Sequence, residues 1–375
     1  MTRKLGEMGT FIKGAPLSKA DISDEGTPFI LYGELYTTYS EVTNSVKRKT
    51  DKTVEHQFYS KIGDVIMPTS GETPEDIATA SCIMIPDVIL AGDLLIYRTE
   101  QIDGRFVSFC VKNKVNKQIS SVAQGKSVVH VRAEELSKIS VTFPALDEQQ
   151  KILSLLESID RRIATQQKLI ETLKKYKRGL LMHYFSDDRT QQWTHYSISQ
   201  IGKVITGSTP PTNDRSNYDG ELLFCSPGDV GEEKYISSTE KRVSPKGFAL
   251  GRPLPPNSVI VTCIGLIGKL GIATTGMITN QQINALVVSE GFDHEFIYYA
   301  FENFFPEYRS KVSMQTLPIL SKSEFEKLII KAPVLDVQLK ISSHLASMDR
   351  RIEHTQKELN LLFEQRRGII QQLFI

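Results

Sequence analysis

The residues best suited to catalysis are scattered along this chain. None of its seven histidines forms an H-x-x-x-H pair or lies at ligand spacing from a cysteine, so we expect no metal site. The four cysteines, Cys82, Cys110, Cys225 and Cys263, are far apart in the sequence. Isolated thiols of this kind usually pack as small hydrophobic residues in a reducing compartment. These residues therefore predict neither a metal centre nor a disulfide framework.

Motifs for nucleotides and nucleophiles are equally weak. The segment Gly265–Gly271 spaces its glycines by three, but no Rossmann helix or acidic ribose partner follows, which favours a loop between strands. The sequence contains no G-x-x-x-x-G-K-[ST] loop and no G-x-S-x-G elbow. The run Thr209–Thr212 lacks the amide and the aromatic ring that would hold a flipped adenine. We therefore expect a binding or assembly protein, not an enzyme.

Length and charge limit the remaining classes. The chain has 375 residues, which suggests two or three domains. Its 45 basic and 44 acidic residues give a net charge of +1, so a polyanionic partner would have to meet locally segregated charge. The first residues lack a signal core, and no run of 18 apolar residues exists. We expect a cytoplasmic protein that does not bind membranes.

The clearest feature of the sequence is an internal duplication. Residues 144–185 align without a gap with residues 333–374, and about 19 of 42 positions are identical. The tetrapeptide Asp-Arg-Arg-Ile recurs at 160–163 and 349–352. A weaker match links residues upstream of each copy. The chain therefore reads as two units, each a variable globular part followed by a similar helix.

Both repeated segments carry an apolar heptad seam. The seam positions recur at alternating spacings of four and three, with the polar residues Gln166 and Thr355 at equivalent positions in the two copies. The apolar seam residues are Ile152, Leu156, Ile159, Ile163, Ile170, Leu173, Ile341, Leu345, Met348, Ile352, Leu359 and Leu362. A long helix with such a stripe needs a partner. We favour pairing between the two helices, because both lie in one chain. The alternative is that each helix docks on its own globular domain.

The globular parts show short runs typical of mixed, irregular sheets. The predicted strands are Asp64–Pro68, Asp93–Tyr97, Phe106–Val111, Val128–Val131, Leu222–Cys225, Ser258–Cys263 and Ile283–Val288. Short helices are predicted at 294–305 and 322–328. Polar, turn-rich loops connect these elements.

The duplicated motifs resemble those of the specificity subunit of type I restriction–modification systems. The resemblance rests on Pro-Ala-Leu-Asp-Glu-Gln-Gln-Lys-Ile at 144–152 and Pro-Val-Leu-Asp-Val-Gln-Leu-Lys-Ile at 333–341, and more weakly on Gly-Ser-Thr-Pro at 207–210. It covers nearly the whole chain. It implies an α+β fold in which two globular mixed α/β target recognition domains are joined by two long antiparallel coiled-coil helices with pseudo-two-fold symmetry. The expected boundaries are 1–143 and 186–332 for the domains and 144–185 and 333–375 for the spacer helices.

The resemblance also implies partners. Such subunits bind double-stranded DNA, and methyltransferase subunits, here expected to be two, dock on their helices; restriction–translocase subunits complete the complex. S-adenosylmethionine, ATP and Mg would then belong to those partners, with no cofactor on this chain. Two different domains held by a common spacer would read an asymmetric, split target. A coiled-coil scaffold without base reading is the alternative function.

Candidate DNA contacts combine basic clusters with polar loop residues. Arg and Lys are the commonest readers of guanine, and Asn and Gln suit adenine. The expected DNA-binding residues are Lys47, Arg48, Lys49, Ser70, Thr73, Ser208, Thr209, Asn213, Lys241, Arg242, Asn280 and Gln281. For each polar residue the competing interpretation is turn or capping chemistry, and for each basic run it is a solvated surface.

Overall fold

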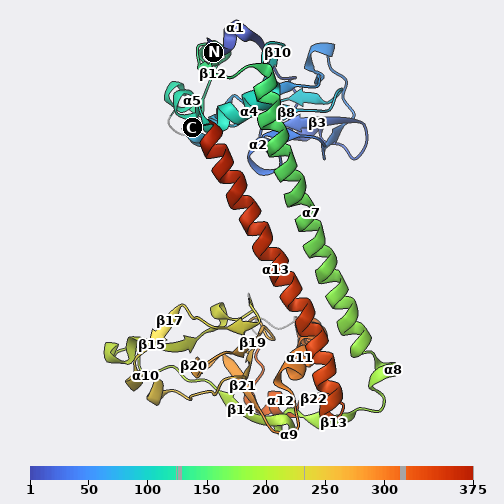
Figure 1. The fold of residues 1–375 in the computed structure, drawn as a ribbon, viewed down its shortest axis with the longest axis vertical. Coiled ribbons are helices and arrows are strands. Elements are labelled where there is room, and N and C mark those ends of the chain that lie inside the picture. The colour runs from blue at the N-terminus through green and yellow to red at the C-terminus, as the bar shows by residue number, and fades with distance from the viewer. Residues whose placement is uncertain (124, 126–128, 232, 313–317, 375) are drawn as a thin grey trace. The chain divides into compact units, whose positions relative to one another are not determined.

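A computed structural model describes residues 1–123, 125, 129–231, 233–312 and 318–374. The chain divides into two compact units. Unit 1 consists of Met1–Gln166 and Glu358–Ile375, and unit 2 consists of Gln167–Lys357. The long helices α7 (Leu146–Tyr184) and α13 (Leu335–Phe374) each contribute to both units (Figure 1).

Unit 1 is built around two small sheets. The larger has the order β2–β10–β6–β8–β4, with bounds Gly9–Lys13, Leu94–Thr99, Asp64–Pro68, Ser81–Ile83 and Val42–Thr43. The smaller has the order β5–β3–β9, with bounds Lys49–Thr50, Thr27–Leu31 and Ile89–Ala91. Two further ribbons pair β1 (Thr2–Lys4) with β12 (Ser140–Thr142) and β7 (Ser70–Gly71) with β11 (Val129–His130).

Unit 2 repeats the two sheets of unit 1 and one of its two ribbons. Its five-stranded sheet has the order β14–β21–β18–β19–β16, with bounds Gly202–Thr206, Ile283–Val288, Val259–Thr262, Leu270–Ala273 and Tyr235–Ile236. Its three-stranded sheet has the order β17–β15–β20, with bounds Lys241–Val243, Tyr218–Cys225 and Met277–Thr279. The ribbon pairs β13 (Thr194–Ser197) with β22 (Ile329–Ala332). The duplication seen in the helices therefore extends through the globular parts.

The remaining helices are mostly short and cover the sheets. In unit 1 they are α1 (Leu5–Met8), α2 (Glu34–Thr37), α3 (Pro74–Ile77), α4 (Gly104–Asn113), α5 (Asn116–Val122) and α6 (Ala133–Leu136). In unit 2 they are α8 (Asp187–Thr190), α9 (Ile198–Ile201), α10 (Pro245–Leu250), α11 (His294–Val312) and α12 (Lys322–Lys327).

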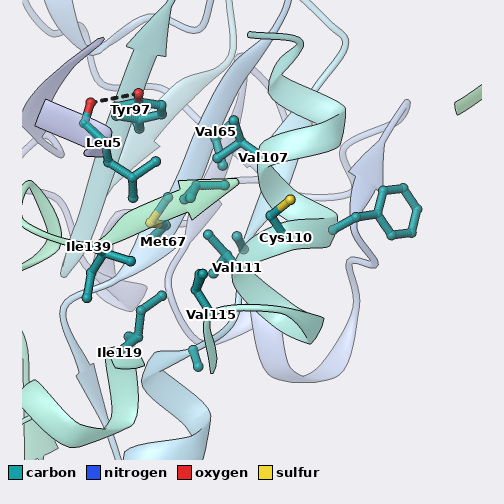
Figure 2. Close-up of a cluster of buried hydrophobic side chains, with 14 of the residues drawn as sticks. Leu5, Val65, Met67, Tyr97, Val107, Cys110, Val111, Val115, Ile119 and Ile139 are labelled. Carbon is teal, nitrogen blue, oxygen red and sulfur yellow. Dashed lines mark hydrogen bonds between the residues drawn. The ribbon is translucent and has the colours of Figure 1, made fainter. Parts of the chain in front are cut away.

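The main core of unit 1 lies between the larger sheet and α4. Figure 2 shows Val65 and Met67 of β6 packed against Val107 and Val111 of α4, and the Tyr97 hydroxyl donating to the Leu5 carbonyl at 2.9 Å. The same cluster contains residues from both ends of the helix pair: Leu153, Leu156, Ile370 and Phe374. Each unit therefore completes its core with the helices.

The predicted helix seam is buried. Ten of its twelve residues are less than 9% exposed, and Ile152 and Ile352 are half-buried. At the ends of the seam, Leu156 joins the core of unit 1, whereas Ile341 and Leu345 join the core of unit 2. The helices thus pack together and also dock on the globular parts, so both of the interpretations left open by the heptad pattern apply, at different positions.

One glutamine in each repeated motif ties a long helix to its globular part. The Gln149 amide accepts from the Asp103 backbone at 3.1 Å and donates to the Pro144 carbonyl at 2.9 Å. In unit 2, Gln338 accepts from the Asp293 backbone at 3.0 Å and donates to a proline carbonyl at 2.8 Å. Both glutamines are 1% exposed. A buried amide must satisfy its polar atoms, which accounts for Gln at the same place in both motifs.

One predicted strand is wrong. Residues 106–111 lie in α4, which begins after Asp103, whose side chain caps the Arg105 amide at 2.9 Å. Phe106, Val107 and Val111 are all buried, so the run is apolar on nearly all sides. A short, fully buried run has no period that separates helix from strand. The cap at Asp103 was the signal that marked a helix.

The seam predicts the effect of a buried charge. Replacing Ile159, which is 6% exposed, with Asp should lower the free energy of unfolding of unit 1 by about 3–5 kcal/mol, because the carboxylate would be desolvated without a partner. Urea denaturation of the full chain measures this loss. Leu155→Asp is the matched control, since Leu155 lies on the same helix and is 47% exposed. Equal stability of the two variants would contradict the buried seam.

Candidate nucleic-acid interface

Four of the predicted DNA-binding residues meet at one end of the small sheet in unit 2. The Ser208 amide donates to the Thr279 carbonyl at 2.8 Å, and the Thr209 hydroxyl donates to Gln281 Oε1 at 2.6 Å. Asn280 follows directly after β20 and accepts from the Gln282 amide at 3.0 Å. We call Gly207–Thr209 and Thr279–Gln281 together the polar loop pair of unit 2.

Gly207 allows these two loops to meet. A Cβ at this position would lie 2.2 Å from both the Asn280 carbonyl oxygen and Thr279 Oγ1. Real Cβ atoms essentially never approach other atoms so closely, so any larger residue would push the loops apart. The glycine of the Gly-Ser-Thr-Pro motif is therefore required by close backbone approach.

The basic pair Lys241–Arg242 lies on the edge strand of the same small sheet. Both residues are exposed on β17, which pairs with β15, and β15 pairs in turn with β20. The Arg242 guanidinium donates to the Glu221 carbonyl at 3.3 Å and has a long 3.5 Å contact with the Glu221 carboxylate, whose side chain is 95% exposed. The guanidinium therefore stays available for another anion.

Lys246, four residues after Arg242, has a different role. Its ammonium forms an ion pair with Asp214 at 2.7 Å, next to the exposed loop residue Asn213. Hydrogen bonds from Lys246 and Ser216 lower the pKa of Asp214 to about 2. Lys246 is thus engaged in holding the loop that presents Asn213.

In unit 1 the basic cluster Lys47–Lys49 also lies at the edge of the small sheet. Lys47 and Lys49 are exposed, and Lys49 begins β5. Arg48 forms a 3.2 Å ion pair with Glu34, whose side chain is only 4% exposed. Arg48 therefore neutralises a buried carboxylate, whereas the two lysines face the solvent.

The basic clusters of the two units occupy equivalent positions. Phe29 pairs with the first residue of β9, as Leu223 pairs with the first residue of β20. The Arg48 carbonyl accepts from the Phe29 amide at 3.0 Å, and Arg242 pairs with Leu223. Each arginine follows a lysine. The register thus relates two Lys-Arg pairs that sequence comparison alone did not connect.

Ser70 and Thr73 lie apart from this arrangement and have structural partners. Ser70 is 5% exposed and donates to Asp93 at 3.1 Å. Thr73 accepts from the Asp76 amide at 3.2 Å and caps α3. These contacts match the turn and capping chemistry that was the competing interpretation. A DNA-binding role for either residue stays a prediction.

Two features of the surface were missed by sequence reasoning. Arg252 is exposed and donates to the Thr206 carbonyl at 2.9 Å, beside the polar loop pair of unit 2. In unit 1, a hollow of about 810 Å³ is lined by Lys13, His130 and Arg132, among others. Lys13 and Arg252 are far from the others in the sequence, and His130 and Arg132 belong to no recognised motif, so no local pattern marked them.

The cysteines are buried thiols. Burial raises the pKa of Cys263 to about 11 and the pKa of Cys110 and Cys225 to about 12. A thiol that stays protonated is a poor nucleophile. Among the described residues, no group of three His, Cys, Asp or Glu side chains could hold a metal ion. Every helix in the described ranges is too short or too polar to span a membrane.

Comparison with known proteins identifies the family. The model of the type I restriction modification DNA specificity domain matches the chain twice, at residues 1–175 and 190–362. The chain belongs to this family of specificity subunits. Its members are the non-catalytic specificity components of type I restriction–modification enzymes.

Individual relatives are distant. The specificity subunit of the MjaIX enzyme of Methanocaldococcus jannaschii is 29% identical over 46% of this chain, and the match spans only 41% of that relative. The MjaVIII specificity subunit of the same organism is 22% identical over 95% of this chain and 87% of its own length. The crystal structure of the S subunit from M. genitalium has a TM-score of 0.64 at 16% identity, covering all of this chain and 96% of that one. That likeness supports the fold.

The close approach at Gly207 generates a prediction. Gly207→Ala should separate the polar loop pair of unit 2 and lower the free energy of unfolding of unit 2 by about 1–3 kcal/mol, the usual cost of overpacking. Gly228→Ala is the matched control, because a Cβ there would meet only Ser226 Oγ, at 3.9 Å. Thermal denaturation of both variants gives the comparison. A Gly207→Ala variant as stable as the control would show that the loops can move without cost.

Proposed function

We propose that this chain is the DNA-reading subunit of a type I restriction–modification complex and that it reads an asymmetric, bipartite target. The supporting observation is the Lys-Arg pair at the equivalent sheet edge of both units. Because the two Lys-Arg pairs are equivalently placed, both units can approach DNA in the same way. The loops around the two pairs differ in sequence. Two unlike half-sites are the expected consequence.

Each globular part, 1–143 and 186–332, acts in this proposal as one target recognition domain. The solvent-facing lysines at both sheet edges and Arg242 contact phosphates or guanine edges, while Arg48 stays paired with Glu34. The polar loop pair of unit 2 offers Thr209, Asn280 and Gln281 to bases. Because the net charge is only +1, partner subunits supply much of the phosphate contact. Helices 144–185 and 333–375 act as the spacer.

The helices also offer a surface for partners. In unit 1, Leu155, Leu361 and Phe363 are 47%, 57% and 43% exposed. Arg161 and Arg162 line a groove beside Leu361. Exposed apolar side chains next to cations are typical of protein interfaces. We propose that methyltransferase subunits dock here, that restriction–translocase subunits complete the complex in the cytoplasm, and that S-adenosylmethionine, ATP and Mg bind to those partners.

A methylome tests the proposal directly. The chain is co-expressed with its genomic methyltransferase partner in a host free of other methylation, and modified adenines are mapped by long-read sequencing. A split, asymmetric motif is expected. A folded and bound partner that modifies no DNA would instead favour a scaffold that does not read bases.

The edge-strand arginine and lysine in unit 2 should affect one half of the motif only. Replacing Lys241 and Arg242 together with Ala should reduce discrimination in one half-site by about tenfold or more, since a good base contact contributes roughly 1–3 kcal/mol. The methylome of the variant measures degeneracy at each position. Lys322→Ala with Lys327→Ala removes the same charge from α12 and serves as the control. Equal loss in both halves would argue against modular reading.

Helix length should set the spacer. Inserting one heptad in each of α7 and α13 adds about 10 Å of helix, equivalent to about three base pairs of B-DNA. We expect a longer preferred spacer between unchanged half-sites in the methylome. A heptad inserted in α7 alone is the control, because it moves the seam out of register and should destabilise the chain. An unchanged spacer in the double insertion would refute the spacer role.

A further inference from the structure

A cluster of charges around one buried carboxylate lies where the globular part of unit 1 meets the helices. Arg366 of α13 forms an ion pair with Asp160 of α7 at 2.6 Å and with Glu41 at 3.0 Å. The Glu41 side chain is 7% exposed and also accepts from Lys112 of α4, at 3.0 Å. We call these four residues the unit 1 junction. Their formal charges cancel.

Unit 2 has a cluster at the corresponding place. Lys177 of α7 contacts Asp349 of α13 at 2.7 Å and Glu302 of α11 at 2.9 Å. Lys234, whose side chain is 9% exposed, forms an ion pair with Glu295 and lies 3.7 Å from Asp349. We call these five residues the unit 2 junction. The domain again supplies charges of both signs to a helix–helix ion pair.

The Lys234 ammonium is also surrounded by aromatic rings. It lies 4.2 Å from the ring centroid of Tyr299 and 5.1 Å from those of Tyr235 and Tyr298. The Tyr299 hydroxyl accepts from Lys234 at 2.7 Å and donates to Asp349. Ring faces and carboxylates together replace the water that a buried ammonium loses.

The helix residues of the two junctions are equivalent. Asp160 and Asp349 are the aspartates of the repeated Asp-Arg-Arg-Ile motif. Lys177 and Arg366 are likewise separated by 189 residues, the offset of the repeat. Both units therefore present the same acid–base pair to the domain.

The domain residues are equivalent in place but opposite in charge. The carbonyl of Glu41 accepts from the Cys82 amide of β8 at 2.9 Å, and the carbonyl of Lys234 accepts from the Ile272 amide of β19 at 2.8 Å. The two residues therefore occupy the same backbone position. An acid stands there in unit 1 and a base in unit 2.

The second domain residue is inverted as well. The Asp103 amide donates to Gln149, and the Asp293 amide donates to Gln338, which is the equivalent glutamine of the second repeat. These matching hydrogen bonds show that α4 and α11 begin at equivalent positions. Lys112 lies nine residues after Asp103, and Glu302 lies nine residues after Asp293. The sign of the charge is thus exchanged at two positions of the domain. Exchanging it at one position alone would leave a charge unpaired.

Burial and neighbouring charges act in opposite directions on these groups. Burial raises the pKa of Glu41, but Lys112 and Arg366 outweigh it, so the pKa lies below its ordinary value. Burial lowers the pKa of Lys177, but Glu302 and Asp349 leave it raised. Both groups are therefore charged at neutral pH, and the ion pairs persist there.

We infer that Glu41 with Lys112, and Lys234 with Glu302, are positioning residues that clamp each domain onto the helix pair with opposite charge polarity. A helix–helix ion pair is a dipole, so a domain can complement it with charges in either order, provided that both are exchanged together. A mismatched domain leaves a charge buried without a partner, which is strongly destabilising. The clamp thereby fixes the angle at which a domain leaves the helices.

This inference rests on the proposed function for its effect on DNA reading. A loosened domain should tolerate more than one spacer length, while the bases that its loops contact stay the same. A purely structural role would lower stability without changing spacer selectivity. Spacer selectivity therefore distinguishes a positioning residue from a merely stabilising one.

The test exchanges the polarity of unit 1 for that of unit 2. Glu41→Lys places a third base beside Arg366 and Lys112 and should lower the melting temperature of unit 1 by about 8 °C. Lys112→Glu should act in the same direction. The double variant E41K/K112E reproduces the charges of unit 2 at these two positions, and should recover most of the loss. Glu100→Lys and Lys117→Glu are exposed controls in the same unit.

Each variant is then co-expressed with the methyltransferase partner for a methylome. Glu41→Lys should modify targets with spacers one base pair longer or shorter, and E41K/K112E should restore the single wild-type spacer. The inference is overturned if the double variant is as unstable or as relaxed as the single ones, or if Glu41→Lys matches the controls. Failure of the proposed function is separate, because the wild-type chain would then yield no split motif at all.

Discussion

The apolar seam shared by α7 and α13 is the contact on which both units depend. Isolated helices in water are marginal, and most helical stability in proteins comes from packing of an apolar face. Here that face continues at its ends into the globular cores, with Leu156 and Phe374 in unit 1 and Leu345 in unit 2. The charged junctions lie next to these apolar contacts. Ion pairs depend on direction, whereas apolar contacts do not. Hydrophobic burial holds the domains to the helices, and ion pairs select one orientation.

The helices and the duplication were predictable because they repeat in the sequence with a clear period. The sequence predicts strands β6 and β21 with the correct bounds, since Gly63 and Pro68 delimit the first apolar run and Gln282 and Ser289 flank the second. The run 106–111 failed for the opposite reason, as burial on most sides of α4 removes the polar face that reveals a helix. The strand-for-strand identity of the two sheets was invisible beforehand, because the residues there differ while the hydrogen-bond register persists.

The candidate site was predicted in part. Thr209 and Gln281 were chosen by residue type, and the structure joins them through a hydrogen bond across 72 positions of sequence. The equivalence of Arg48 and Arg242 needed the register of the sheets, which no local pattern encodes. The junction escaped notice because a search for repeats scores identity, and Glu41 and Lys234 differ as much as two residues can in charge. Charges that complement one another in the folded protein need not produce similar residues in the two repeats.

The burial of Phe374 has a consequence for synthesis on the ribosome. Its ring stacks on Phe109 at 5.5 Å between centroids and packs against Phe106 at 5.0 Å, so the core of unit 1 is complete only after α13 has been synthesised. At roughly 5–20 residues per second, translation takes tens of seconds to join these rings. During that interval the apolar pocket around α4 has no occupant. Nascent unit 1 is thus a natural client for a chaperone until α13 has been synthesised.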